Sequence, residues 1–122
     1  MKIKLIDKKF SVCKVREYRM EDISGEFCFS GRTDEENSLV CPTERVPDDT
    51  IKRDDGWTAF RIEGELDFSL IGILAEISAL MADEGIGIFA VSTYNTDYIF
   101  VKEDNFQKAV DVLRKNGYKI MR

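Results

Sequence analysis

The stretch IGIFAVSTYNTDYIFV, residues 86–101, decides the fold of this chain of 122 residues. It contains two apolar runs, 86–92 and 97–101, which predict two β-strands because β-branched and aromatic residues favour strands. Between them, Thr-Tyr-Asn-Thr at 93–96 predicts a turn, in which asparagine is a favoured residue. The stretch therefore predicts an antiparallel β-hairpin.

A strand and a helix are predicted before this hairpin. Residues 57–63 alternate apolar and polar side chains, which is typical of a strand. The apolar residues that follow recur at helical spacing: Leu70, Ile73, Leu74, Ile77 and Met81. Asp67 or Ser69 would cap the start of this helix, and Gly85 would end it.

A second helix and a short strand are predicted after the hairpin. The buried stripe of this helix would be Phe106, Ala109, Val110 and Leu113. Asp104 with Gln107 approximates a capping box, Asn116-Gly117 would end the helix, and 118–120 would form the last strand. From residue 56 the order is β-α-β-β-α-β, the ferredoxin-like α+β motif, in which two helices cover one face of an antiparallel sheet.

The first half of the chain is predicted to consist mostly of strands. These are 9–15, 26–31 and 38–42, and the polar turn 32–37 makes the last two a hairpin. The polar stretch 43–55 predicts a loop or linker. The pattern indicates a reduced copy of the same unit, without its first helix, whose strands extend the sheet. No residue-level repeat is found in the sequence.

Composition and charge disfavour several classes of function. The net charge is −5 and no basic patch stands out, which disfavours nucleic acid and acidic membrane surfaces as partners. The chain has no histidine, so Ser-His and Cys-His catalysis and histidine-based metal sites are excluded. No signal peptide is expected at the N-terminus, and the apolar stretch 70–82 is too short and too polar to span a bilayer.

The cysteine pattern predicts free thiols. Cys13, Cys28 and Cys41 are odd in number and no two have C-x-x-C spacing, which disfavours a disulfide framework or a zinc knuckle. Each lies among alternating apolar residues, as small buried thiols do. A reducing, cytoplasmic location is therefore expected.

Several stretches resemble the tandem ACT-domain proteins of bacteria, a group related in fold to amino-acid-sensing ACT proteins, including the arginine sensors of animal growth signalling. The resemblance lies in EGELDFSLIGILA at 63–75 and most specifically in STYNTDY at 92–98. FSVCKV at 10–15 and ENSLVCP at 36–42 extend it into the first half. It implies an ACT domain at 56–122 preceded by a reduced, mostly-strand ACT-like unit at 1–50.

The resemblance also implies a function and an assembly. The chain is expected to be a regulatory module, not an enzyme, that binds an amino acid or a similar small ligand and forms a homodimer. In sensing ACT proteins the ligand lies where two ACT units meet. Because the first unit is short here, a complete site would need a second chain. No cofactor and no metal are expected.

Two segments are the candidate binding residues. One is the strand-to-helix loop, comprising Gly64, Glu65, Leu66, Asp67 and Phe68. The other is the hairpin turn, comprising Ser92, Thr93, Tyr94, Asn95, Thr96 and Asp97. Backbone N–H groups at a helix start suit a carboxylate, and the Asp97 carboxylate suits an ammonium group.

Structural roles compete with these assignments. Asp67 could equally serve as a helix cap instead of a ligand contact. Asn95 and Thr96 are also ordinary turn residues, and Asp97 could instead form a hydrogen bond inside the hairpin. A cation site at 48–49 and 54–55 is a minor alternative to a solvated acidic loop.

Three other functions compete with the ligand-binding module. A ligand-free dimerisation or interaction module is the main alternative. An RNA-binding domain would use Tyr98 and Phe100 as stacking residues, but its basic positions are absent. An enzyme would need an activated nucleophile, and no residue has a recognisable activating base.

Overall fold

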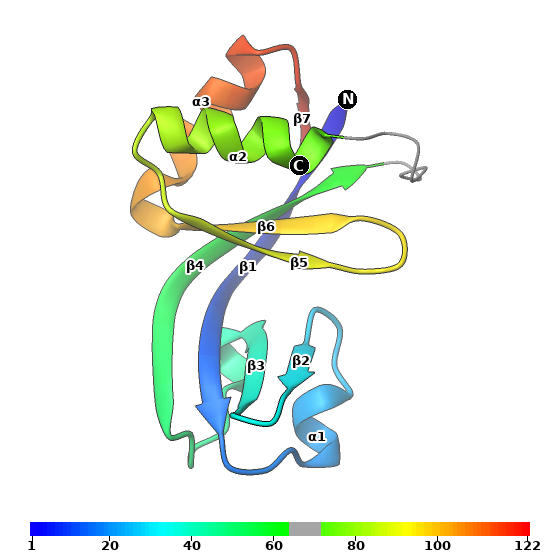
Figure 1. Cartoon of the computed structure of the whole chain (residues 1–122), viewed down its shortest axis with the longest axis vertical. Helices are drawn as coiled ribbons and strands as arrows, with labels where there is room; N and C mark the ends of the chain where they lie inside the picture. The colour runs from blue at the N-terminus through cyan, green and yellow to red at the C-terminus, as the bar shows by residue number, and fades with distance from the viewer. Residues whose placement is uncertain (64–71) are drawn as a thin grey trace. The chain divides into compact units, whose positions relative to one another are not determined.

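The computed structural model describes residues 1–63 and 72–122. Figure 1 shows the elements, whose bounds are β1 (Lys2–Val15), α1 (Met20–Ile23), β2 (Phe29–Arg32), β3 (Asn37–Pro42), η1 (Thr43–Arg45), β4 (Lys52–Glu63), α2 (Ile73–Asp83), β5 (Ile88–Ser92), β6 (Asp97–Lys102), η2 (Glu103–Asn105), α3 (Phe106–Lys115) and β7 (Lys119–Met121). Among the described residues, no helix is long and apolar enough to cross a membrane.

The chain forms two compact units. The larger unit consists of Met1–Asp7 and Thr58–Arg122, and the smaller unit is Lys8–Trp57. Strands β1 and β4 each contribute one part to both units. These compact units have different bounds from the two predicted domains, and a compact unit need not coincide with one copy of a repeat. The division into an ACT-like unit at 1–50 and an ACT domain at 56–122 therefore stays a prediction.

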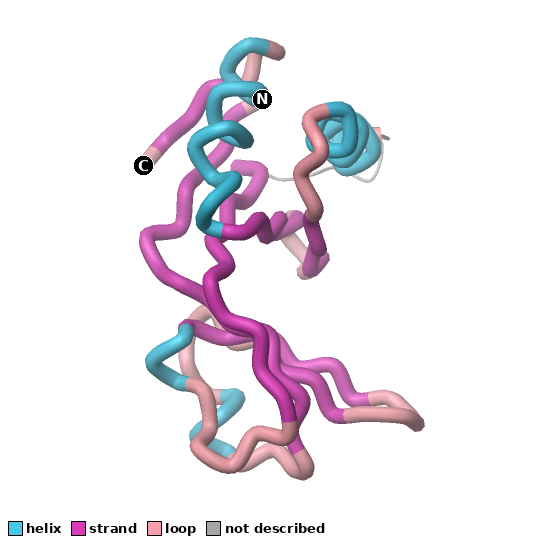
Figure 2. The backbone as a smooth tube through the Cα atoms, turned by 90° about the vertical axis from the view of Figure 1, so that its left-hand side faces the viewer, coloured by secondary structure: helices cyan, strands magenta, loops and turns pink. Residues whose placement is uncertain are grey.

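The larger unit has the predicted β-α-β-β-α-β order, from β4 to β7. Strands β5 and β6 pair antiparallel from Ile88 opposite Val101 to Ser92 opposite Asp97, which confirms the hairpin. Strand β6 lies beside β4. Figure 2 shows α2 and α3 as the two long helical segments of this unit.

An N-terminal strand completes the sheet of the larger unit. The first residues of β1 pair in parallel with β7, with Lys2 opposite Lys119 and Lys4 opposite Met121. The prediction of a first strand only from residue 9 is therefore wrong at its start. Ile3 and Leu5 alternate with lysines and are buried, so the strand pattern was present but short.

The core of the larger unit lies between the helices and one face of its sheet. Its buried side chains are Ile3, Leu5, Phe60, Ile62, Ile77, Met81, Ile86, Ile99, Val101, Ala109, Val110, Leu113 and Tyr118. Phe60 and Ile62 of β4 share this core with residues of both helices. Both helices therefore cover the same face, as predicted, and alternate β4 residues point to the other face.

Glycines end both helices as predicted. Gly85 has φ +69° and Gly117 has φ +92°, left-handed values that favour glycine. The N–H of Ile86 donates to the Met81 carbonyl over 2.9 Å, and that of Tyr118 donates to the Leu113 carbonyl over 3.0 Å. These are Schellman ends, which satisfy helix carbonyls and turn the chain back.

The helix starts differ from the predictions. The N-cap residue of α2 is Gly72, and the proposed caps Asp67 and Ser69 lie outside the described residues. The capping box at Asp104 and Gln107 is wrong, because η2 occupies 103–105 and the Gln107 amide donates to Asp111 within α3 instead.

The smaller unit is mostly strand, as predicted. Strand β3 pairs antiparallel with β1 and with β2. Its core consists of Cys13, Val15, Leu39 and Cys41, with Tyr18, Cys28 and Val46 packed against it. Cys13 and Cys41 are buried as predicted, whereas Cys28 is only half-buried.

Two predictions for the smaller unit are wrong. The first helix is not missing but reduced to the single turn α1, in which the Asp22 carboxylate accepts the N–H of Arg19 at 2.9 Å. The stretch 43–55 is not all loop, because η1 begins it and β4 already starts at Lys52. The first residues of β4 are charged and exposed, so the strand lacks an apolar signal there.

Candidate functional site

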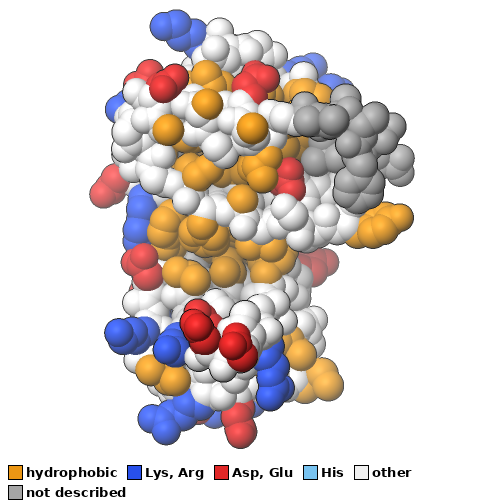
Figure 3. Space-filling view, in the orientation of Figure 1, with side chains coloured by type: hydrophobic (Ala, Val, Ile, Leu, Met, Phe, Trp, Pro, Cys, Tyr) orange, Lys and Arg blue, Asp and Glu red, His pale blue; other side chains and the backbone are white. Residues whose placement is uncertain are grey.

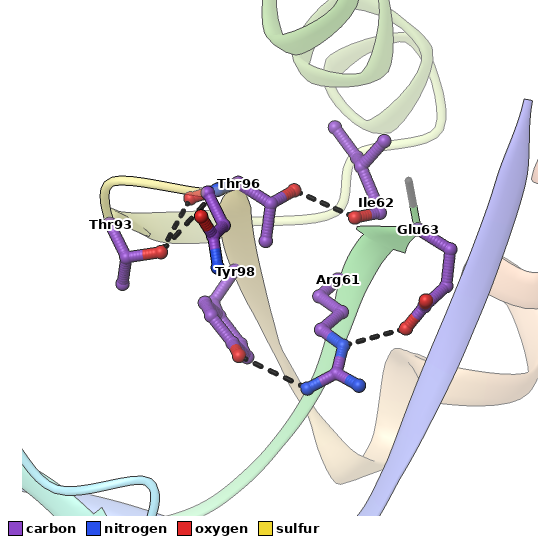
Figure 4. Close-up of a pocket in the computed structure, with 7 residues that line it drawn as sticks. Arg61, Ile62, Glu63, Thr93, Thr96 and Tyr98 are labelled. Atoms are coloured by element: carbon purple, nitrogen blue, oxygen red, sulfur yellow. Dashed lines mark hydrogen bonds and ion pairs between the residues drawn. The ribbon is translucent and has the colours of Figure 1, made fainter. Parts of the chain in front are cut away.

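A polar pocket of about 410 Å³ lies in the larger unit beside the β5–β6 turn. Figure 4 shows its lining residues, which come from β4 and from the hairpin: Arg61, Ile62, Glu63, Thr93, Asn95, Thr96 and Tyr98. The pocket combines charged, hydroxyl and amide groups, so it suits a small polar ligand.

Strand β4 places the two charged groups of the pocket. Phe60 and Ile62 point into the core under the helices. Because side chains alternate along a strand, Arg61 and Glu63 share the opposite face. Their side chains are 30% and 28% exposed, so both charges are partly shielded from solvent.

Arg61 is held by two partners. Its Nε donates to Glu63 Oε1 over 2.7 Å, and its Nη1 donates to the Tyr98 hydroxyl over 3.2 Å (Figure 4). The guanidinium carbon also lies 5.9 Å from the centre of the Tyr98 ring, within cation–π range. The bond to Glu63 first, and then that to Tyr98, raises the pKa of Arg61, so this cation stays charged in the pocket.

The hairpin turn is closed by Thr93 and joined to β4 by Thr96. The N–H of Thr93 donates to the Thr96 carbonyl over 2.8 Å, and its hydroxyl donates to the same carbonyl over 3.1 Å. The Thr96 hydroxyl is buried and donates to the Ile62 carbonyl over 2.7 Å. These bonds fix one wall of the pocket.

The predicted hairpin residues separate into two groups. Thr93, Asn95 and Thr96 line the pocket. Tyr94 is 92% exposed at the tip of the turn, and the Ser92 hydroxyl donates to Asp97 Oδ1 over 2.6 Å. Asp97 therefore makes a hydrogen bond inside the hairpin, and its contact with a ligand stays a prediction.

The predicted loop residues cannot be compared with the pocket. Gly64, Glu65, Leu66, Asp67 and Phe68 all lie outside the described residues. Their assignment to the ligand stays a prediction.

Four pocket residues were not assigned to a small ligand from the sequence: Arg61, Ile62, Glu63 and Tyr98. The alternation of apolar and polar residues at 57–63 indicates that Arg61 and Glu63 lie on one face of their strand. The sequence does not predict which residues lie beside them, because the pairing of β4 with β6 is a long-range contact. For Tyr98, the sequence pattern suggests only a role as an RNA-stacking residue.

Two of the acidic residues from the stretch 48–55 pair with arginines of the chain. Asp49 lies 2.6 Å from Arg19 Nη2, and Asp55 accepts two bonds from Arg53. Within residues 1–63 and 72–122, no cluster of three or more cysteine or carboxylate side chains could hold a metal ion.

Known structures resemble this chain over nearly its full length. Protein Atu0741 from Agrobacterium tumefaciens is 29% identical with a TM-score of 0.89, and the match covers 98% of this chain and 91% of that one. The ligand-free regulatory subunit of aspartate kinase from Thermus thermophilus is 9% identical with a TM-score of 0.64, covering 93% and 95%. At that identity the second match shows the fold alone.

Sequence comparison adds a curated relative and a family. The human cytosolic arginine sensor for mTORC1 subunit 1 is 35% identical over 60 residues, which are 48% of this chain. The match spans only 18% of the sensor's length. A family model for the ACT domain matches residues 52–115, more than half of the chain. The chain therefore belongs to the ACT-domain family.

Proposed function

We propose that this chain is a regulatory module that binds an amino acid or a similar small ligand in the polar pocket beside the β5–β6 turn. The observation that carries the proposal is the convergence of Arg61, Glu63 and the hairpin residues Thr93, Asn95 and Thr96 on one pocket of an ACT domain. An arginine sensor among the similar proteins supports a regulatory role.

The chemistry of the pocket fits such a ligand. An amino acid needs hydrogen-bond donors for its carboxylate and acceptors for its ammonium group. The pocket offers a guanidinium, a carboxylate, two threonine hydroxyls and one carboxamide. Charge-assisted hydrogen bonds of this kind contribute about 1.5–3 kcal/mol each, which is enough for binding at metabolite concentrations when several act together.

The proposal extends to assembly. ACT ligands lie where two ACT units meet, and the smaller unit of this chain has only one-turn helical segments. We therefore propose that two chains form a homodimer and that the second chain completes the ligand site.

A thermal-shift screen against the twenty amino acids and several nucleotides, each at millimolar concentration, tests ligand binding. A ligand present at 100 times its Kd stabilises the fold by about 2.7 kcal/mol, which raises Tm by several degrees. Asn95→Ala should reduce the shift, because Asn95 lines the pocket. Tyr94→Ala is the matched control, because that side chain is 92% exposed in the same turn. A flat response of the wild-type protein to the whole panel would contradict ligand binding.

One observation favours an interaction module as the second candidate. Helix α2 exposes three alanines spaced along it, Ala75, Ala79 and Ala82, with Leu74 and Leu80 half-buried beside them. Figure 3 shows separate hydrophobic side chains among polar atoms over α2. Sedimentation would show a dimer in the absence of any ligand, and Ala79→Glu would dissociate it.

A further inference from the structure

We propose that Arg61 and Glu63 act as one specificity-determining pair, which binds the carboxylate and the ammonium group of a single zwitterionic ligand. The pocket then selects free amino acids over molecules that carry only one of these charges. The inference rests on the function proposed above, because it assigns the charged groups of the same pocket.

The geometry leaves both groups able to bind a ligand while they remain paired. Arg61 uses Nε toward Glu63 and Nη1 toward Tyr98. Glu63 uses Oε1 toward Arg61. Within the described part of the chain, Nη2 of Arg61 and Oε2 of Glu63 make no hydrogen bond. A carboxylate can therefore bind Nη2 while a neighbouring ammonium group binds Oε2.

The charges of the pair explain the selectivity. A ligand with only a carboxylate gains from Arg61 but is repelled by Glu63, whose Oε1 is 2.7 Å from the Arg61 Nε atom. A ligand with only an ammonium group is attracted by Glu63 but repelled by Arg61. A zwitterion can place each of its charges beside the opposite charge of the pair. Partial burial strengthens these attractions and repulsions, because fewer water molecules screen the charges.

The hydrogen-bond partners of Arg61 fix the orientation of its guanidinium group. The Tyr98 hydroxyl accepts from Nη1 at 3.2 Å, and the Tyr98 ring lies near the guanidinium carbon. A guanidinium held at both Nε and Nη1 presents Nη2 in one direction, and such preorganisation lowers the entropy cost of binding.

A second pair on the same strand provides a contrast within the chain. Arg53 and Asp55 have the same spacing on β4, but Arg53 donates from Nε to one carboxylate oxygen and from Nη2 to the other, at 3.1 and 3.2 Å. Asp55 also accepts the Ser11 hydroxyl at 2.6 Å. Both carboxylate oxygens are therefore engaged, and the side chains are 42% and 50% exposed. This pair is the matched control for Arg61 and Glu63.

The experiment compares each amino acid that raises Tm with two of its analogues, the decarboxylated amine and the acid that lacks the amino group. Calorimetry on the full chain should show both analogues binding the wild-type protein about 10- to 100-fold more weakly. Arg61→Gln should weaken binding of the amino acid by a similar factor. It should also reduce the difference in affinity between the amino acid and its decarboxylated amine, because the amine has no carboxylate for Arg61 to bind. Glu63→Gln should reduce the difference in affinity between the amino acid and the acid that lacks the amino group. Arg53→Gln should change neither of these two differences.

The outcomes separate this inference from the function on which it rests. If an amino acid binds but Arg61→Gln and Glu63→Gln both leave its affinity and its advantage over the analogues within twofold, the pair does not determine specificity and the ligand-binding function stands. If no amino acid binds the folded wild-type protein, the proposed function fails and the inference fails with it. Circular dichroism establishes that each variant is folded, and Arg61→Lys distinguishes the loss of charge from the loss of the fork.

Discussion

Thr33 and Thr93 occupy the same position in the two hairpins of the chain and share the hydrogen bonds that close the turn. The N–H of Thr33 donates to the Glu36 carbonyl over 2.9 Å, and that of Thr93 donates to the Thr96 carbonyl over 2.8 Å. In both turns the threonine hydroxyl also accepts the N–H of the residue three positions later, at 3.1 Å and 3.4 Å.

The match continues beyond the turns. A 3₁₀ segment follows each hairpin directly, Thr43–Arg45 in the smaller unit and Glu103–Asn105 in the larger one. Both hairpins are therefore closed in the same way and followed by the same kind of segment, which supports the prediction that the smaller unit is a reduced copy of the larger one. Only the threonine that closes the turn is kept between the two turn sequences, which explains why no residue-level repeat is visible.

The two turns predict different effects for the same kind of substitution. Thr96→Val leaves the Ile62 carbonyl without the donor that it has at 2.7 Å in a buried position, so it should lower the free energy of unfolding by about 1–3 kcal/mol. Thr33→Val removes hydroxyl bonds that are exposed to solvent and should cost less than about 1 kcal/mol. Urea unfolding measures both, and equal losses would show that the Thr96–Ile62 bond does not anchor the hairpin.

The larger unit was predictable from sequence because its signals are local. Apolar spacing defines α3, and glycines mark both helix ends, as at Gly85. The β5–β6 hairpin carries its own turn residues. These features depend on neighbours in the sequence, where periodicity and turn chemistry act.

The rest of the structure depends on long-range contacts. The start of β1 is a strand because Ile3 and Leu5 complete the core formed by residues more than fifty positions away. The charged start of β4 has no apolar pattern, and its strand geometry comes from pairing with β1. The pocket follows the same rule, since Arg61 meets Tyr98 only after β4 and β6 pair.

Tyr118 predicts a loss of stability at alkaline pH. Burial first, and then the hydrogen bond to Glu76 at 2.9 Å, raises the pKa of its phenol to about 12. Because the folded pKa exceeds the ordinary value of about 10, the stabilisation is complete below pH 10 and is lost as the pH rises through 12. A shift of about two pKa units corresponds to a full loss of roughly 3 kcal/mol.

The difference between the wild-type protein and Tyr118→Phe isolates this contribution, because the titration of lysines affects both proteins alike. Urea unfolding at pH 8 to 12 should show the wild-type protein losing stability relative to Tyr118→Phe only above about pH 10. A difference that stays constant over this range would show that Tyr118 titrates as it does in the unfolded chain.

The cysteines predict an order of alkylation in the folded protein. Cys28 is half-buried, whereas Cys13 and Cys41 are buried. A hydrogen bond from the Cys41 thiol to Cys13, together with burial, raises the pKa of Cys41 far above its ordinary range, and the same bond lowers the pKa of Cys13. Iodoacetamide should therefore modify Cys28 first and Cys41 last, because the thiolate is the reactive form. Peptide mass spectrometry follows the three sites, and modification of Cys41 at the rate of Cys28 would contradict the packing of this cluster.

Gly85 and Gly87 predict opposite results for the same substitution two positions apart. Gly85 has φ +69° at the Schellman end of α2, where a Cβ is disfavoured by about 1–2 kcal/mol. Gly87 has no such backbone angle, and a Cβ there meets nothing within 4 Å. Gly85→Ala should therefore destabilise the protein by about 1–2 kcal/mol, whereas Gly87→Ala should be neutral or stabilise it by up to about 1 kcal/mol through the unfolded chain. Thermal and urea unfolding of both variants measure the difference. Equal stabilities would show that the end of α2 tolerates the side chain, and that Gly85 does not determine where the helix stops before β5.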